Sequence, residues 1–232
     1  MAIDLSTCGN IPSNVSTILN DHIEEFRKIE FLDELLEISE LHDVVVALDQ
    51  VAESQGVVLY HYTRNFRETL AREGLALKSG KERRSEFLAQ FKDQLSQSQI
   101  QKLRVGWDNY FNSEQNRSRD ERIWFNLTLS ALSNGGAFPL LSHYGGEVVY
   151  MPFSRDPDLS NFLGSIGEPL IVRAIANVDS LTTFDVYPWG KTWLSTFHKE
   201  LNPDAIQKDF DVYTKQPIPP ECIQSIEVVS GH

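Results

Sequence analysis

Hydrophobic residues recur at helical spacing in the first quarter of the chain. Between residues 15 and 54 apolar side chains repeat every three or four positions, the period of one helix face. The intervening positions are rich in Asp and Glu, so the pattern predicts acidic amphipathic helices with either a solvated face or a face for a basic partner. We expect the rear of a β-sheet to bury their apolar stripe, which comprises Leu32, Leu35, Leu36, Val44, Val45 and Leu48.

The period changes at residues 55–56. Residues 57–60 form a short apolar run with β-branched side chains, which predicts a buried strand. Residues 65–73 then predict a short helix that ends before Gly74, because glycine is favoured just beyond a helix C-terminus. After a short extended piece, residues 81–112 return to the helical period and predict a helical insertion.

The second half of the chain predicts short strands joined by irregular segments. Residues 113–120 are uniformly polar and predict a loop, whereas residues 122–127 have strand composition. Further strands are expected at residues 169–175 and 223–229, with a short extended piece at residues 209–213. Short strands without regular βαβ alternation predict an α+β fold.

Composition narrows the function classes. The chain has 232 residues, of which 41% are hydrophobic and 23% charged, as is usual for globular proteins. Its formal charge of −12 opposes non-specific binding to nucleic acid. A locally basic stretch at residues 78–104 is the exception, and it reads either as a nucleic-acid contact or as an ordinary solvated helix face.

Cysteine content and hydropathy indicate the cellular compartment of the protein. Cys8 and Cys222 lie near opposite ends of the chain without a CxxC pair, so neither a disulfide framework nor a metal site is expected. The first residues lack a basic segment followed by an apolar one, and no apolar run approaches the length of a membrane span. We therefore expect a cytoplasmic protein without a membrane partner.

The end of the first predicted strand carries hydrogen-bonding side chains. His61, Tyr62 and Thr63 follow the apolar run directly, and the short helix with its closing Gly74 comes next. A single histidine at a strand end is more often structural than functional. The order of strand, His-x-Thr triplet, helix and Gly-Leu resembles the opening of the ADP-ribosyltransferase-like fold of the DarT toxins, the tRNA 2′-phosphotransferases and the poly(ADP-ribose) polymerases.

This resemblance implies a split antiparallel sheet core and a site that binds NAD. It implies that His61 holds the adenosine-side ribose, that Thr63 contacts the nicotinamide ribose or amide, and that Tyr62 and Arg122 belong to the same site. The closing segment at residues 218–228 resembles the Ile-Pro-x-x-x-Ile-x-x-Ile strand of these folds. A catalytic acid commonly precedes that strand, and this chain has Asp209 and Asp211 there but no Glu.

A third motif supplies a candidate carboxylate. Residues 142–147 read Ser-His-Tyr-Gly-Gly-Glu, follow an Arg-x-Trp-Phe strand, and resemble a segment of bacterial relatives of this fold. Glycines at 145 and 146 permit positive φ and a close approach of a ligand to the backbone. The alternative is an ordinary glycine turn with exposed Tyr144 and Glu147.

The chemistry explains why such residues would be used. Cleavage of the nicotinamide–ribose bond passes through an oxocarbenium-like state, which a carboxylate such as Glu147 or Asp209 stabilises. An aromatic ring such as Tyr144 or Tyr150 can stack on nicotinamide, and a carboxylate can act as base toward the incoming nucleophile. This chemistry requires no metal.

Together these features predict an NAD-dependent mono-ADP-ribosyltransferase that modifies a nucleic acid or protein. Family analogy suggests the toxin of a bacterial phage-defence or toxin–antitoxin system with a neutralising partner protein. The alternative is a catalytically silent relative that binds a nucleotide or a partner protein. The expected organisation is an acidic helical segment at residues 1–55 and a transferase-like domain at residues 56–232, with the insertion at 81–112.

Overall fold

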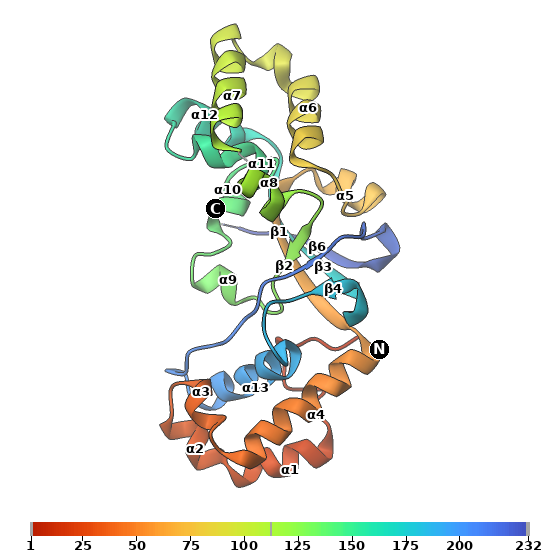
Figure 1. Cartoon of the computed structure of the whole chain (residues 1–232), viewed down its shortest axis with the longest axis vertical. Helices are drawn as coiled ribbons and strands as arrows, with labels where there is room; N and C mark the ends of the chain where they lie inside the picture. The colour runs from red at the N-terminus through yellow and green to blue at the C-terminus, as the bar shows by residue number, and fades with distance from the viewer. Residues whose placement is uncertain (1, 112, 231–232) are drawn as a thin grey trace. The chain divides into compact units, whose positions relative to one another are not determined.

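The computed structural model describes residues 2–111 and 113–230, and these residues form a mixed helix-and-strand structure. Helices and strands occur with two small antiparallel sheets, so the α+β class predicted from the sequence is confirmed. One sheet has the strand order β1-β3-β6 and the other β2-β5-β4 (Figure 1). The strands are β1 (Val57–Asn65), β2 (Ile123–Phe125), β3 (Glu168–Ala176), β4 (Leu181–Thr182), β5 (Val212–Thr214) and β6 (Ile223–Val228).

The chain divides into two compact units, each built from three separate segments. Unit 1 contains residues 1–60, 124–134 and 173–214, and unit 2 contains residues 61–123, 135–172 and 215–232. Three of the five divisions fall inside β1, β2 and β3, and the other two fall after residue 134 and after residue 214. Neither unit follows the expected boundary at residues 55–56; whether residues 56–232 form one transferase-like domain stays a prediction.

Unit 1 has a helical core with a small sheet. Its helices are α1 (Ser13–Asp21), α2 (Ile23–Lys28), α3 (Leu32–Leu35), α4 (Ser39–Gln55), α9 (Ser130–Ser133) and α13 (Pro188–Leu201). The acidic helices are present as predicted, and α1, α2, α4 and α13 gather around one another in Figure 1. Strands β4 and β5 pair antiparallel, with Leu181 opposite Thr214 and Thr182 opposite Tyr213.

The apolar stripe of the acidic helices is covered by a helix. We expected the rear of a sheet in that position, but α4 packs chiefly against α13, which the sequence pattern had not indicated. Val44, Val45 and Leu48 are fully buried there. The two helices approach closely at Gly190, where an added Cβ would lie 2.0 Å from the Val45 carbonyl oxygen.

Unit 2 is built mainly from helices around an aromatic core. Its helices are α5 (Arg67–Glu73), α6 (Gly80–Phe91), α7 (Gln97–Tyr110), α8 (Ser113–Arg119), α10 (Phe138–Ser142), α11 (Glu147–Tyr150) and α12 (Pro157–Ser165). Short 3-10 turns follow α6 at Lys92–Gln94 and α11 at Met151–Phe153. The core is formed chiefly by α6, α7, α11 and α12: Phe87, Phe91, Leu103, Trp107, Val149, Phe153, Leu159 and Leu163.

Local signals explain where these helices begin and end. Ser79 and Ser96 each start a helix with a capping box, in which the serine and the third helical side chain satisfy backbone N–H groups in both directions. Gly74 follows α5 with φ of 71°, as expected for a glycine that ends a helix. Helices α6 and α7 lie in the stretch predicted to be helical, and α7 ends at Tyr110. Whether residues 81–112 are an insertion in a transferase-like domain stays a prediction, and Asn112 lies outside the described residues.

One local prediction is wrong. Residues 113–120 were expected to form a loop because they lack apolar side chains, yet Ser113–Arg119 is helix α8. Within it, Arg119 donates from Nη1 to Gln115 Oε1 at 2.5 Å, four residues earlier on the same helix face. Such an i,i+4 pair stabilises a polar helix without an apolar stripe.

Candidate functional site

The His61-Tyr62-Thr63 triplet lies inside β1, in the part that belongs to unit 2. Tyr62 and Thr63 are buried, with 3% and 8% of their surface exposed, whereas His61 is half-buried. His61 is therefore the member of the triplet that keeps most access to solvent.

Arg64 anchors the end of this strand. Its Nε donates to the Ile166 carbonyl at 2.9 Å, and its Nη2 donates to the Gly167 carbonyl at 3.1 Å. A third, longer bond runs from Nη1 to the Leu141 carbonyl at 3.3 Å. Burial lowers the pKa of the Arg64 guanidinium. Its three hydrogen bonds to backbone carbonyls give the side chain a structural role.

A backbone pairing joins two of the predicted motifs. Arg64 forms an isolated parallel bridge with Tyr144, so the strand that carries the triplet meets the segment at residues 143–147 within unit 2. The two stretches are about eighty residues apart in sequence, and the motifs alone did not show that they meet.

The two glycines of that segment have the backbone geometry that the sequence predicted. Gly145 and Gly146 have φ of 89° and 73°, a region that residues with a Cβ rarely adopt. A Cβ added at Gly146 would meet no atom within 4 Å, so there is open space beside its backbone. Glu147 follows as the first residue of α11, and this space lies next to the candidate carboxylate.

Glu147 is held by an arginine that the motifs did not point to. Arg119 at the end of α8 donates from Nε to Glu147 Oε2 at 2.9 Å. The Glu147 side chain keeps 41% exposure and that of Arg119 keeps 19%. The spacing of Gln115 and Arg119 was a signal for helix α8, but no sequence signal paired Arg119 with Glu147.

The tyrosines proposed to stack on nicotinamide already contact other rings. The Tyr150 ring stacks on His143 with centroids 4.9 Å apart and an interplanar angle of 22°. Tyr144 packs against three phenylalanine rings, those of Phe66, Phe87 and Phe91. Burial raises the pKa of both tyrosines, which are thus neutral and poorly suited to act as bases.

His143 is also tied to its own surroundings. Its Nδ1 lies 3.0 Å from the Pro139 carbonyl oxygen, and its Nε2 lies 2.9 Å from Ser160 Oγ. These contacts set the orientation of the ring that stacks on Tyr150. Arg122, the remaining predicted NAD contact, is half-buried in unit 2 just before β2.

Asp209, the alternative catalytic carboxylate, belongs to unit 1. It accepts hydrogen bonds from the Leu127 N–H at 2.9 Å, Thr128 Oγ1 at 2.7 Å and Ser130 Oγ at 2.8 Å. Burial raises its pKa, and these three donors act in the opposite direction. These three hydrogen bonds give Asp209 a structural role, because they hold the chain between β2 and α9 in place. Asp211 also has a partner, because it accepts from Asn126 Nδ2 at 3.0 Å.

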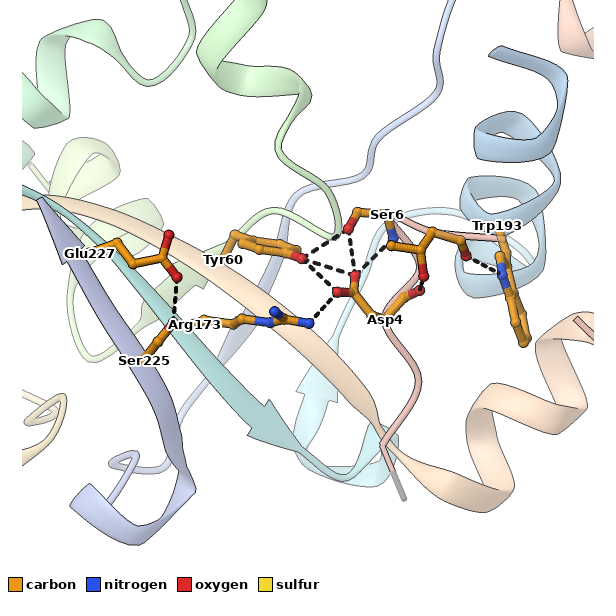
Figure 2. A network of polar contacts seen from close by, with 8 residues as sticks. Asp4, Ser6, Tyr60, Arg173, Trp193, Ser225 and Glu227 are labelled. Atoms are coloured by element: carbon orange, nitrogen blue, oxygen red, sulfur yellow. Dashed lines mark hydrogen bonds and ion pairs between the residues drawn. The ribbon is translucent and has the colours of Figure 1, made fainter. Parts of the chain in front are cut away.

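A second polar network fixes the beginning of the chain within unit 1. Figure 2 shows the Asp4 carboxylate between the Tyr60 hydroxyl, at 2.9 and 3.0 Å from its oxygens, and an Arg173 guanidinium nitrogen. Ser6 donates to the same carboxylate from its N–H and its hydroxyl. Burial, with the nearby Asp4 charge, raises the pKa of Tyr60 to about 12. The network is internally satisfied at Asp4 and therefore reads as structural.

Comparison with known proteins found no similar protein: the chain matches no family model, and no curated protein or solved structure shows significant similarity to it. Among the described residues, no three His, Cys, Asp or Glu side chains group in a way that would hold a metal ion. Nor does any helix in residues 2–111 and 113–230 have the length and apolarity to cross a bilayer.

Proposed function

We propose that the chain is an NAD-dependent mono-ADP-ribosyltransferase whose site lies in unit 2, around the end of β1 and residues 143–150. The observation that carries the proposal is the Arg64–Tyr144 bridge, which brings the His61-Tyr62-Thr63 strand to the segment that contains Glu147. In this proposal the β1-β3-β6 sheet is part of a split-sheet core of the transferase type.

Each group has a role in the proposed reaction. His61 and Thr63 hold the riboses of NAD, with Tyr62 and Arg122 in the same site, and the open backbone at Gly146 admits the dinucleotide. Glu147 stabilises positive charge on the ribose as the nicotinamide bond breaks, because a fixed carboxylate near a developing cation lowers the barrier. A nucleophile on a nucleic acid or protein then captures the ribose. We place the protein in the cytoplasm as a defence or toxin–antitoxin component.

A second candidate function is favoured by the contacts of the same residues. Glu147 is paired with Arg119, and the two tyrosine rings are stacked or packed against neighbouring side chains. Side chains that are already engaged in this way are less available for chemistry on NAD, which suits a catalytically silent relative that binds a nucleotide or a partner protein.

One experiment separates the two. The purified full chain is incubated with labelled NAD and a cell lysate, and both free nicotinamide and label on macromolecules are measured. Transfer of label supports the transferase. Neither nicotinamide release nor labelling, together with NAD binding in a calorimetric titration, supports a silent relative that binds a nucleotide. Absence of release, labelling and NAD binding overturns both the transferase and the nucleotide-binding relative.

A further inference from the structure

A hollow in unit 1 is lined by none of the residues of the proposed NAD site. It has a volume of about 400 Å³, within the usual range for ligand-binding sites. One wall is a single face of α4, and the other is formed by residues 178–189, which lead into α13. All its lining residues belong to unit 1.

Carboxylates line this hollow without a basic residue among its lining. Asp49 and Glu53 lie one helical turn apart on α4, and Asp185 lies on the opposite wall. Asp185 is neutralised by Lys191, whose Nζ is 2.6 Å from Oδ1. Asp49 is only 4% exposed and accepts the Gly190 N–H at 2.9 Å at the start of α13.

Glu53 is the carboxylate that remains available. It is exposed, and no described residue forms an ion pair with it. Burial raises the pKa of Asp49 and the charge of Glu53 adds to that shift, whereas the Gly190 N–H and the charge of Lys191 oppose it. As like charges one helical turn apart, Asp49 and Glu53 repel one another. A cation seated between them would relieve this repulsion.

One part of the rim of the hollow carries exposed apolar side chains. Val186 is 64% exposed and Tyr187 is 36% exposed, and both line the hollow. Beside them Phe184 is 75% exposed and stacks on Trp124 with centroids 6.1 Å apart. Neighbouring large apolar side chains exposed in this way mark interaction surfaces more often than chance.

We propose that this hollow is the docking site for a partner polypeptide that inserts a Lys or Arg side chain toward Glu53 and Asp49, with apolar neighbours that cover Val186 and Phe184. Charge complementarity identifies the inserted side chain as basic. The exposed rim identifies a polypeptide, because a free amine would leave the Phe184 ring uncovered. The chain's net charge of −12 steers such a basic partner toward it.

The test uses two fluorescein-labelled peptides and the full chain. The first is Leu-Trp-Arg-Leu-Lys-Leu-amide with fluorescein on its N-terminal amine, and the second, labelled in the same way, replaces Arg and Lys by Gln. Fluorescence anisotropy should show saturable binding of the basic peptide and at least tenfold weaker binding of the Gln peptide. Spermidine at equal concentration should compete at least tenfold less well than unlabelled basic peptide; equal competition would indicate an amine site and overturn the polypeptide partner.

Two exposed variants localise the binding. Glu53→Lys should weaken binding of the basic peptide at least tenfold. Glu34→Lys, the same charge change on α3 of unit 1, should weaken that binding less than threefold. Val186→Ser should reduce binding without a change of charge. Equal loss in both charge variants would mean non-specific attraction, and unchanged binding in Glu53→Lys would place the peptide elsewhere; either result overturns the proposal.

Discussion

At the scale of single residues, His61 is the side chain on which the proposed NAD site depends most. It is the half-buried member of a strand-end triplet whose other members are buried. We expect His61→Ala to weaken NAD binding at least tenfold while circular dichroism stays unchanged. His42→Ala, at an exposed histidine of unit 1, is the control and should bind NAD as the wild type does. Unchanged NAD affinity in a folded His61→Ala variant would remove this residue from the site.

A buried histidine makes unit 1 sensitive to pH. The His198 ring is fully buried, and burial lowers its pKa, although its Nε2 lies 2.8 Å from the Ile29 carbonyl oxygen. The edge of Phe26 and the charge of Lys199 also face it. Because the unfolded histidine takes up its proton at about pH 6.5, the stability due to the neutral ring is complete above that pH and is lost as the pH falls below it.

The expected result is a smaller pH dependence in a variant that cannot titrate. Urea unfolding of the wild type should show a falling free energy of unfolding between about pH 7 and pH 5.5, and His198→Gln should show a shallower fall. If His198→Gln is too unstable to compare, the chemical shift of the wild-type His198 ring gives its pKa directly. A value at or above about 6.5 would contradict this explanation.

At the scale of elements, the hydrophobic period of the sequence was sufficient to predict an element wherever that element has a clear apolar pattern of its own. The helices at residues 15–54, the strand at 57–60 and the helical insertion were predicted because their apolar residues follow one period. Helix α8 was missed because a side-chain pair and not an apolar stripe supports it. Helix α13 was missed because several of its buried positions carry polar side chains, among them Thr192, Ser195 and His198, which obscure the apolar period.

The close contact of α4 with α13 gives a prediction on packing. Gly190→Ala would place a Cβ 2.0 Å from the Val45 carbonyl oxygen, and backbone on both helices leaves no flexible group to move aside. Forced overpacking of this kind costs roughly 1–3 kcal/mol or more. Urea unfolding should show that loss, and Gly9→Ala, where nothing lies within 4 Å, should change the free energy of unfolding by less than about 0.5 kcal/mol. Equal stability of the two variants would mean that the helices are not packed this closely.

At the scale of the whole molecule, the beginning of the chain and the acidic helices pack in unit 1 against α13, which comes from the second half of the sequence. Trp193 donates from Nε1 to the Thr7 carbonyl at 3.0 Å, and Thr196 donates to the Leu5 carbonyl at 2.7 Å. The sequence suggested that residues 1–55 are a helical segment attached to a separate domain at residues 56–232, because its resemblance to a known family began after Gly56. The sequence could not predict contacts between distant segments, because the apolar pattern of a helix shows that one face is buried but not which segment covers it.

These contacts lead us to expect that residues 2–54 cannot be removed. Their deletion would expose the face of α13 that α4 covers, so the fragment should be insoluble or lack cooperative unfolding in urea. A soluble fragment with a cooperative transition would support the attachment instead. The full chain, purified in parallel, is the control for solubility and for the unfolding transition.

Glu147 is proposed to serve the cleavage of NAD in unit 2, and steady-state nicotinamide release by the purified full chain tests this role. A carboxylate that stabilises an oxocarbenium-like state acts on turnover more than on binding, so Glu147→Gln should lower kcat on the order of a hundredfold with little change in KM. The matched exposed variant Glu221→Gln should retain wild-type kcat. Wild-type release with an unchanged kcat in Glu147→Gln would contradict the assignment of this carboxylate, and no release by the wild type would contradict the transferase itself.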